Sequence, residues 1–135
     1  VCGWTDPDNR RTFPWGNENW DILEFHKYAI SLHKRYRSLC HGSLVPILGE
    51  HNLIAYIRSV KDEQMLIVIY TGSEEIEVDI PVWLMGLKNK DKLVRVMLTE
   101  KDSYNVGELS IEVKGSSTKL KLKKNTAAMY LAKSQ

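Results

Sequence analysis

Two charged side chains near the start of the chain, Asp6 and Arg10, could hold a polar ligand between them. A carboxylate accepts hydrogen bonds from adjacent hydroxyl groups, and a guanidinium offers a planar fork of donors. The residues alone leave a second interpretation open, in which Asp6 caps a turn and Arg10 is a solvated charge. Both lie in segment 1–16, whose prolines, glycines and Asp-Pro-Asp-Asn cluster predict a loop.

Histidine and cysteine positions do not predict metal chemistry. His26 and His33 share one side of a predicted helix, but a metal site prefers i, i+4 spacing and a third ligand nearby. We therefore expect them to pack, and we expect no metal and no cofactor. Cys2 and Cys40 are expected to be free thiols of a cytoplasmic protein rather than a disulfide.

Charge and hydropathy exclude two classes of partner. The formal net charge is only +2, and the lysines at 114, 119, 121, 123 and 124 have no aromatic residues interleaved with them. They predict a solvated strand face rather than a nucleic-acid interface. No apolar run approaches the ~20 residues of a membrane span, so no membrane partner is expected.

One long amphipathic helix is predicted over residues 18–40. Asn17 or Asn19 can cap its start, and Gly42 follows its end. At 100° per residue the apolar side chains cover roughly half of the circumference, which is wider than the stripe of an ordinary surface helix. This face is formed by Ile22, Leu23, Phe25, Ala29, Ile30, Leu32, Tyr36, Leu39 and Cys40. Such a helix requires partners on more than one flank.

From residue 43 onward the hydrophobic period becomes two. The candidate strands are 43–48, 52–60, 64–71, 75–80, 93–98, 108–113, 118–123 and 126–132. Short strands with turns at this spacing predict a mainly β fold, an antiparallel sandwich. The lysines of Lys-Leu-Lys-Leu-Lys should face water and the leucines the core. Segment 81–92 fits neither period and is expected to be an irregular crossover.

The order of loop, helix and strands resembles the C-terminal part of α-amylase-family (glycoside hydrolase family 13) enzymes, of the neopullulanase, cyclomaltodextrinase and pullulanase type. Three stretches carry the resemblance: Asp6-Pro7-Asp8-Asn9-Arg10-Arg11 with Phe13-Pro14-Trp15, the helix ILEFHKYAISLHKRYRSLCHGSL, and the strands from Asn52 to the closing GELSIEVKGSSTKLKLKKNTAAMYLA. The resemblance implies a Greek-key β-sandwich of the α-amylase C-terminal type, preceded by the last helix of a catalytic barrel.

The resemblance also implies roles for individual residues. The family cleaves α-glucosidic bonds with a carboxylate nucleophile and a carboxylic acid. Those groups come from earlier barrel strands whose motifs are absent here, so we assign no catalytic residue. Asp6 and Arg10 match family positions that bind sugar hydroxyls, and Trp4, beside Asp6, is a candidate for stacking on a sugar ring. Trp15 and Trp20 are expected to pack against the helix start, and Trp83 to cover the sandwich.

The chain is thus expected to divide into residues 1–41, the end of a barrel, and residues 42–135, a sandwich that stabilises the barrel. The expected partner is an α-glucan oligosaccharide bound by the parent enzyme. Without a barrel, the wide face of helix 18–40 should fold back on the sandwich or pair with a second copy. A standalone carbohydrate-binding module, which needs a row of exposed aromatics, and a structural interaction domain remain alternatives.

Overall fold

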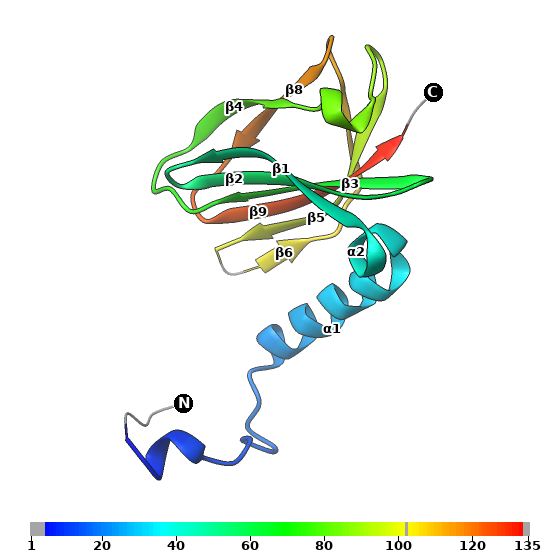
Figure 1. Cartoon of the computed structure of the whole chain (residues 1–135). Coiled ribbons are helices and arrows are strands. Elements are labelled where there is room, and N and C mark those ends of the chain that lie inside the picture. The colour runs from blue at the N-terminus through cyan, green and yellow to red at the C-terminus, as the bar shows by residue number, and fades with distance from the viewer. Residues whose placement is uncertain (1–4, 102, 134–135) are drawn as a thin grey trace.

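The computed structural model describes residues 5–101 and 103–133, apart from the side chain of Asp8 (Figure 1). An N-terminal arm leads into helix α1 (Trp20–Arg35), and a short helix α2 (Arg37–His41) connects it to a β-sandwich. The antiparallel sandwich predicted from the period of two is confirmed. None of the helices in these ranges is long and apolar enough to span a membrane.

The predicted single helix over 18–40 is wrong in one respect, because the chain leaves the helical conformation at Tyr36. This residue is extended, with φ −102° and ψ 116°, although its N–H still donates to the Leu32 carbonyl at 3.0 Å. Of the two predicted caps, Asn19 is the one that caps α1, which begins at Trp20, and its Oδ1 accepts from the Ile22 N–H at 3.1 Å. Arg37 then begins α2, and Gly42 ends it.

Two charged side chains of the sandwich hold α2 from both ends. Glu63 accepts from the Ser38 N–H at 2.7 Å and from the Ser38 hydroxyl at 2.6 Å. Arg58 donates to the carbonyls of Ser38 at 3.2 Å and Leu39 at 3.0 Å. The first N–H and last C=O groups of a helix lack partners within it, so these contacts satisfy both ends. The α2 helix is therefore bound to the sandwich, and Tyr36 is the joint at which α1 departs.

Gly42 is required where α2 meets the sandwich. A Cβ atom at this position would lie 2.2 Å from the Ser38 carbonyl oxygen and 2.9 Å from the Ser59 nitrogen. Both neighbours are backbone atoms and cannot move aside cheaply. The glycine thus allows the close approach of helix and strand.

Nine strands are described, one more than predicted: β1 (Ser43–Glu50), β2 (Leu53–Val60), β3 (Glu63–Tyr70), β4 (Ile76–Pro81), β5 (Lys92–Glu100), β6 (Ser103–Asn105), β7 (Leu109–Glu112), β8 (Ser117–Leu122) and β9 (Thr126–Lys133). The larger sheet has seven strands, in the order β1-β2-β3-β9-β5-β6 with β7 beside β5, and β4 pairs with β8 in a second sheet. The last strand lies between β3 and β5, and β4 and β8 belong to the opposite sheet, as in Greek-key connections.

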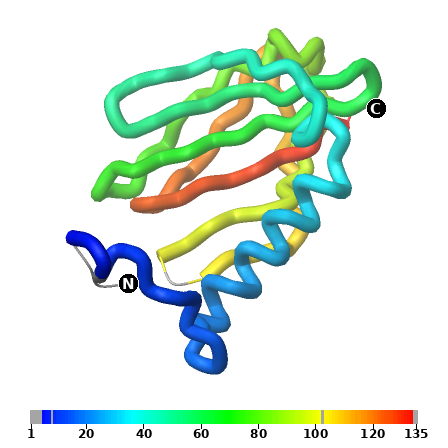
Figure 2. The backbone as a smooth tube through the Cα atoms, turned by 60° about the horizontal axis from the view of Figure 1, so that its bottom comes forward, coloured from blue at the N-terminus to red at the C-terminus, as the bar shows by residue number. Residues whose placement is uncertain are grey.

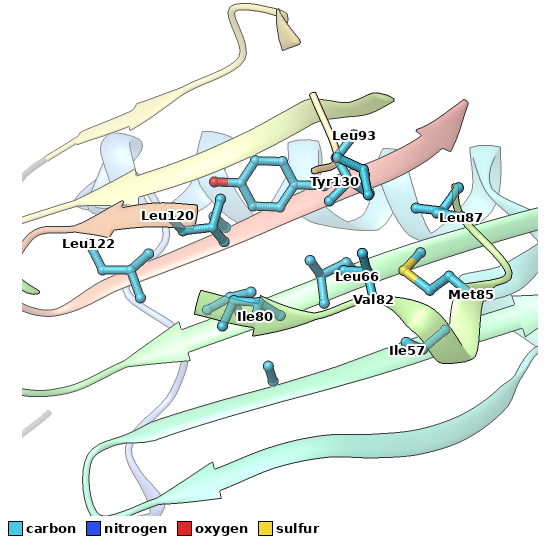
Figure 3. Close-up of a cluster of buried hydrophobic side chains, with 14 of the residues drawn as sticks. Ile57, Leu66, Ile80, Val82, Met85, Leu87, Leu93, Leu120, Leu122 and Tyr130 are labelled. Atoms are coloured by element: carbon cyan, nitrogen blue, oxygen red, sulfur yellow. The ribbon is translucent and has the colours of Figure 1, made fainter. Parts of the chain in front are cut away.

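The larger sheet is apolar on both faces. One face meets β4, β8 and the crossover, and the side chains between them form the main core (Figure 3). Among these, Leu66, Ile80, Val82 and Leu93 are fully buried. The opposite face carries Met65 and Ile67 and packs against the helices in a second core. A strand covered on both sides reads as a continuous apolar run, which explains the sequence of β3.

Helix α1 lies beside β5 and β6, at one edge of the larger sheet (Figure 2). Leu32 and Tyr36 are buried against it, and the Tyr28 hydroxyl donates to the Val96 carbonyl of β5 at 3.1 Å. Burial raises the pKa of the Tyr28 hydroxyl, which favours its neutral donor form. The predicted folding back of the helix on the sandwich is therefore observed for this part of its apolar face.

Candidate functional site

The arm brings the two predicted ligand-binding side chains together. A short 3-10 turn, η1 (Asp8–Arg10), bends the chain so that the Arg10 N–H donates to the Pro7 carbonyl at 3.0 Å. The Arg10 guanidinium then forms a fork on the Asp6 carboxylate: Nε donates to Oδ1 at 2.9 Å, and Nη2 donates to Oδ2. The turn thus aligns the Asp6 carboxylate with the guanidinium of Arg10, four residues later.

The electrostatics of this pair keep both members charged. The Arg10 guanidinium holds the pKa of the Asp6 carboxyl below its ordinary value of 3.8, and the Asp6 carboxylate raises the pKa of Arg10. Both side chains are largely exposed, with 57% of Asp6 and 73% of Arg10 accessible. A solvated pair of this kind adds little to stability.

The pair keeps free hydrogen-bonding capacity. Arg10 has N–H groups that are not directed at Asp6, and each carboxylate oxygen has a further lone pair. Donors and acceptors therefore lie side by side, which suits a ligand with adjacent hydroxyl groups. Trp4, the predicted stacking partner, lies outside the described residues.

The rest of the arm supplies no pocket wall. From Thr5 to Asn17, every side chain that the structure describes is exposed. Phe13 and Trp15 contact each other edge to face, with ring centroids 4.7 Å apart, yet Trp15 is 81% exposed. Within the described residues, the Asp6–Arg10 pair is therefore an open surface feature, not an enclosed cavity.

The predictions for three tryptophans are wrong within this chain. Trp15 and Trp20 were expected to pack at the helix start, but Trp20 is 62% exposed, with the Lys27 ammonium 6.0 Å from its ring. Trp83 was expected to cover the sandwich; in η2 (Trp83–Met85) it is exposed, while Val82 and Met85 enter the core instead. The hydrophobic period of the sequence does not reveal whether these rings are buried within the chain.

An exposed apolar stripe follows α1 next to the face that packs on the sheet. Ile22 and Ile30 form this stripe, and each is more than half exposed; Trp20 is also exposed but projects from another side of the helix. His26 and His33 are also exposed, and His26 Nδ1 lies 2.8 Å from the Ile22 carbonyl. The wide apolar arc predicted from sequence is thus divided: one part is buried on the sandwich and the other faces solvent.

In the described part of the chain, the structure shows a free cysteine and no cluster of metal-binding side chains. Cys40 is a free thiol that donates to the His33 carbonyl at 2.7 Å, with Sγ 3.6 Å from His33 Nδ1. Cys2 lies outside the described residues. Within residues 5–101 and 103–133, no group of three or more His, Cys, Asp or Glu side chains is arranged to hold a metal ion.

Sequence reasoning missed a cleft between α1 and the β5–β6 hairpin, lined by Phe25 and Tyr104. Strand β6 has only three residues, too few for a period-two signal. Tyr104 also attracts no attention in the sequence, because its contacts with Phe25 and Tyr28 join residues far apart in the chain.

The described chain is thus an antiparallel sandwich led by a helix and preceded by an exposed arm that carries a paired carboxylate and guanidinium. No family model matches the chain. Among curated proteins, an amylopullulanase from Thermoanaerobacter thermohydrosulfuricus is 28% identical over 124 residues, which is 82% of this chain and 8% of that protein. A cyclomaltodextrinase from Geobacillus thermopakistaniensis is 30% identical over 96 residues, 64% of this chain and 16% of that protein.

Solved structures agree in fold. The α-amylase of Geobacillus thermoleovorans, in complex with acarbose, superposes with a TM-score of 0.81 at 21% identity, covering 100% of this chain and 28% of that one. A debranching enzyme from Nostoc punctiforme gives 0.67 at 20% identity, covering 93% of this chain and 24% of that one. The chain thus spans less than a third of each of these proteins. The predicted resemblance to the C-terminal part of glycoside hydrolase family 13 enzymes is confirmed.

Proposed function

We propose that this chain supplies the last substrate loop, the last barrel helix and the C-terminal sandwich of an α-glucan hydrolase of the neopullulanase type. The observation that carries the proposal is that one solved α-amylase matches the arm, the helix and the sandwich together, over the whole chain. The sequence relatives are named amylopullulanase, cyclomaltodextrinase and neopullulanase, and an α-glucan substrate is inferred from them.

The role proposed for the arm is binding rather than bond cleavage. A retaining glycosidase needs two carboxyl groups about 5–5.5 Å apart. On the arm, the Asp6 carboxylate faces a guanidinium instead. A carboxylate held ionised by Arg10 is a poor proton donor but a good acceptor for sugar hydroxyls. The proposed ligand is an α-glucan oligosaccharide.

Helix α1 is proposed to join the two units, residues 1–41 and 42–135. Its sheet-facing side is bound to the sandwich, and α2 is held by Glu63 and Arg58. Its exposed stripe of Ile22 and Ile30 is available for the barrel. A helix buried on two flanks explains the wide apolar arc, and the sandwich would then stabilise the barrel by fixing this helix in place.

Titration calorimetry of the purified 135-residue chain with maltotriose tests this function. We expect weak binding, near millimolar or about −4 kcal/mol, because the arm is only one side of the site. Asp6→Asn should weaken it at least about fivefold, whereas Asp62→Asn, an exposed aspartate in the β2–β3 turn, should leave it unchanged. We expect no release of reducing sugar from pullulan or cyclodextrin, and turnover that copurifies with the chain would contradict a purely binding role.

A second proposal follows from the exposed stripe on α1. In the absence of a barrel, two copies could cover their stripes by pairing through Ile22 and Ile30, since exposed apolar patches favour association. Sedimentation equilibrium of the chain and of Ile30→Glu checks it: a monomer at every concentration would exclude pairing. The alternative of a standalone sugar-binding module is weakened, because the large exposed aromatics of the described ranges, Phe13, Trp15, Trp20 and Trp83, lie off the strands.

A further inference from the structure

A cleft of about 800 Å³ opens between the first turns of α1 and the end of the β5–β6 hairpin. Ligand sites in proteins commonly have volumes of about 300–1,000 Å³. The cleft begins at Asn19, where the arm enters the helix, and extends to Tyr104 on β6. It is separate from the Asp6–Arg10 pair, neither of whose residues lines it.

The apolar wall of the cleft is fixed from two elements. Phe25 of α1 meets Tyr104 edge to face, with ring centroids 5.5 Å apart and an interplanar angle of 63°. Tyr104 also stacks on Tyr28, at 5.4 Å and 26°. Tyr28 is in turn anchored by its hydrogen bond to Val96. Rings held in this way lose little conformational entropy when a ligand packs against them, which is what an apolar binding surface needs.

The polar wall has open hydrogen-bonding groups. Asp21 and Ser103 line the cleft and are exposed. Glu100 accepts from Lys123 at 3.1 Å through Oε1. Its other carboxylate oxygen, the Asp21 carboxylate and the Ser103 hydroxyl can therefore accept bonds from a ligand.

The charges around the cleft restrict the class of ligand. Asp21, Glu24, Glu100 and Lys101 line it. Glu24 is paired with Lys27 at 2.8 Å and Glu100 with Lys123 at 3.1 Å, so the charges at the cleft nearly balance and favour neither anions nor cations. An aromatic wall opposite hydroxyl and carboxylate acceptors suits a neutral ligand that has an apolar C–H face and a rim of hydroxyl groups.

We infer that this cleft is a second carbohydrate site, which binds a short neutral glucan segment against Phe25 and Tyr104. Its location is independent of the arm, and only the choice of an α-linked glucan rests on the proposed function. Sugar hydroxyls donate to the carboxylates of Asp21 and Glu100, and a pyranose face packs on the aromatic wall.

Amide NMR of the full 135-residue chain, titrated with maltotriose, tests the inference. We expect saturable shifts at Phe25, Ser103 and Tyr104. Asp21→Asn and Tyr104→Ala should each weaken binding at these signals at least about fivefold. Asp21 is exposed in the first turn of α1, so the Asn variant keeps the fold even where loss of the Tyr104 ring disturbs it. Trp83→Ala removes an exposed aromatic elsewhere and should change nothing.

The same titration separates this inference from the proposed function. Shifts at the cleft that persist in Asp6→Asn support the second site even if the arm binds no sugar. Shifts confined to residues 5–11 overturn the cleft and leave the proposed function intact. Cleft signals that respond to tetramethylammonium but not to maltotriose would show a site for organic cations and overturn the inference.

Discussion

The joint at α2 and the arm before α1 each contain a carboxylate and a guanidinium, but these groups have different roles in the two regions. At the joint, Glu63 and Arg58 are directed at backbone groups of a helix whose Ser38 is fully buried. On the arm, Asp6 and Arg10 are directed at each other in solvent. A charge on buried backbone groups stabilises a fold, whereas an exposed pair stabilises little and remains available to a ligand. Burial thus separates structural from binding charges in this chain.

The largest expected effect extends this contrast between buried and exposed groups to two isoleucines, one in the sandwich core and one on α1. Ile80 of β4 is fully buried between the sheets, so Ile80→Ala should lower the free energy of unfolding by about 2–5 kcal/mol. Ile22 on the exposed stripe of α1 is the matched control, and Ile22→Ala should change it by less than about 0.5 kcal/mol. Urea unfolding monitored by circular dichroism measures both. Equal losses would mean that the stripe is covered in solution.

The joint itself supplies the next effect. Glu63→Ala leaves the N–H and hydroxyl of buried Ser38 without their acceptor, which should cost about 1–3 kcal/mol of the unfolding free energy. It should also speed hydrogen exchange at the amides of α2, because the first turn loses its tie to the sandwich. Glu74→Ala, an exposed glutamate in the β3–β4 connection, is the matched control. Fast exchange confined to α1 would place the weak point at Tyr36 instead.

The same contrast shows what the sequence could predict. The period of two located strands that have one buried side, and β8 alternates between exposed lysines and buried leucines as expected. The helix break at Tyr36 could not be found in this way, because it depends on side chains of β2 and β3 that reach α2 across the fold. Local periodicity carries no information about such contacts.

The site was predicted less completely, for a related reason. Asp6 and Arg10 were found because they match a short loop motif of the family that the chain resembles, and a motif within one turn is a local feature of the sequence. The exposure of Trp15, Trp20 and Trp83 was not predicted, because the apolar character of a ring does not show whether it is buried within this chain. The cleft at Tyr104 depends on pairing between distant segments and had no sequence signal.

The smallest expected effect is a shift in a titration midpoint on the arm. Because Arg10 lowers the pKa of the Asp6 carboxyl, this group should titrate below its ordinary value of 3.8 in the folded chain. Any contribution of the pair to stability is present above the unfolded pKa and is lost as the pH falls through the lower, folded pKa. Carbon-detected NMR of the carboxyl group measures the midpoint directly.

Arg10→Met is the variant that isolates the cause. It removes the guanidinium but keeps a long side chain, so the Asp6 midpoint should rise toward its ordinary value. An Asp6 midpoint that stays low in Arg10→Met would mean that the turn's own amides, rather than Arg10, hold the carboxylate. In that case Arg10 would not be needed to keep the Asp6 carboxylate ionised, and its guanidinium could bind a ligand independently of Asp6.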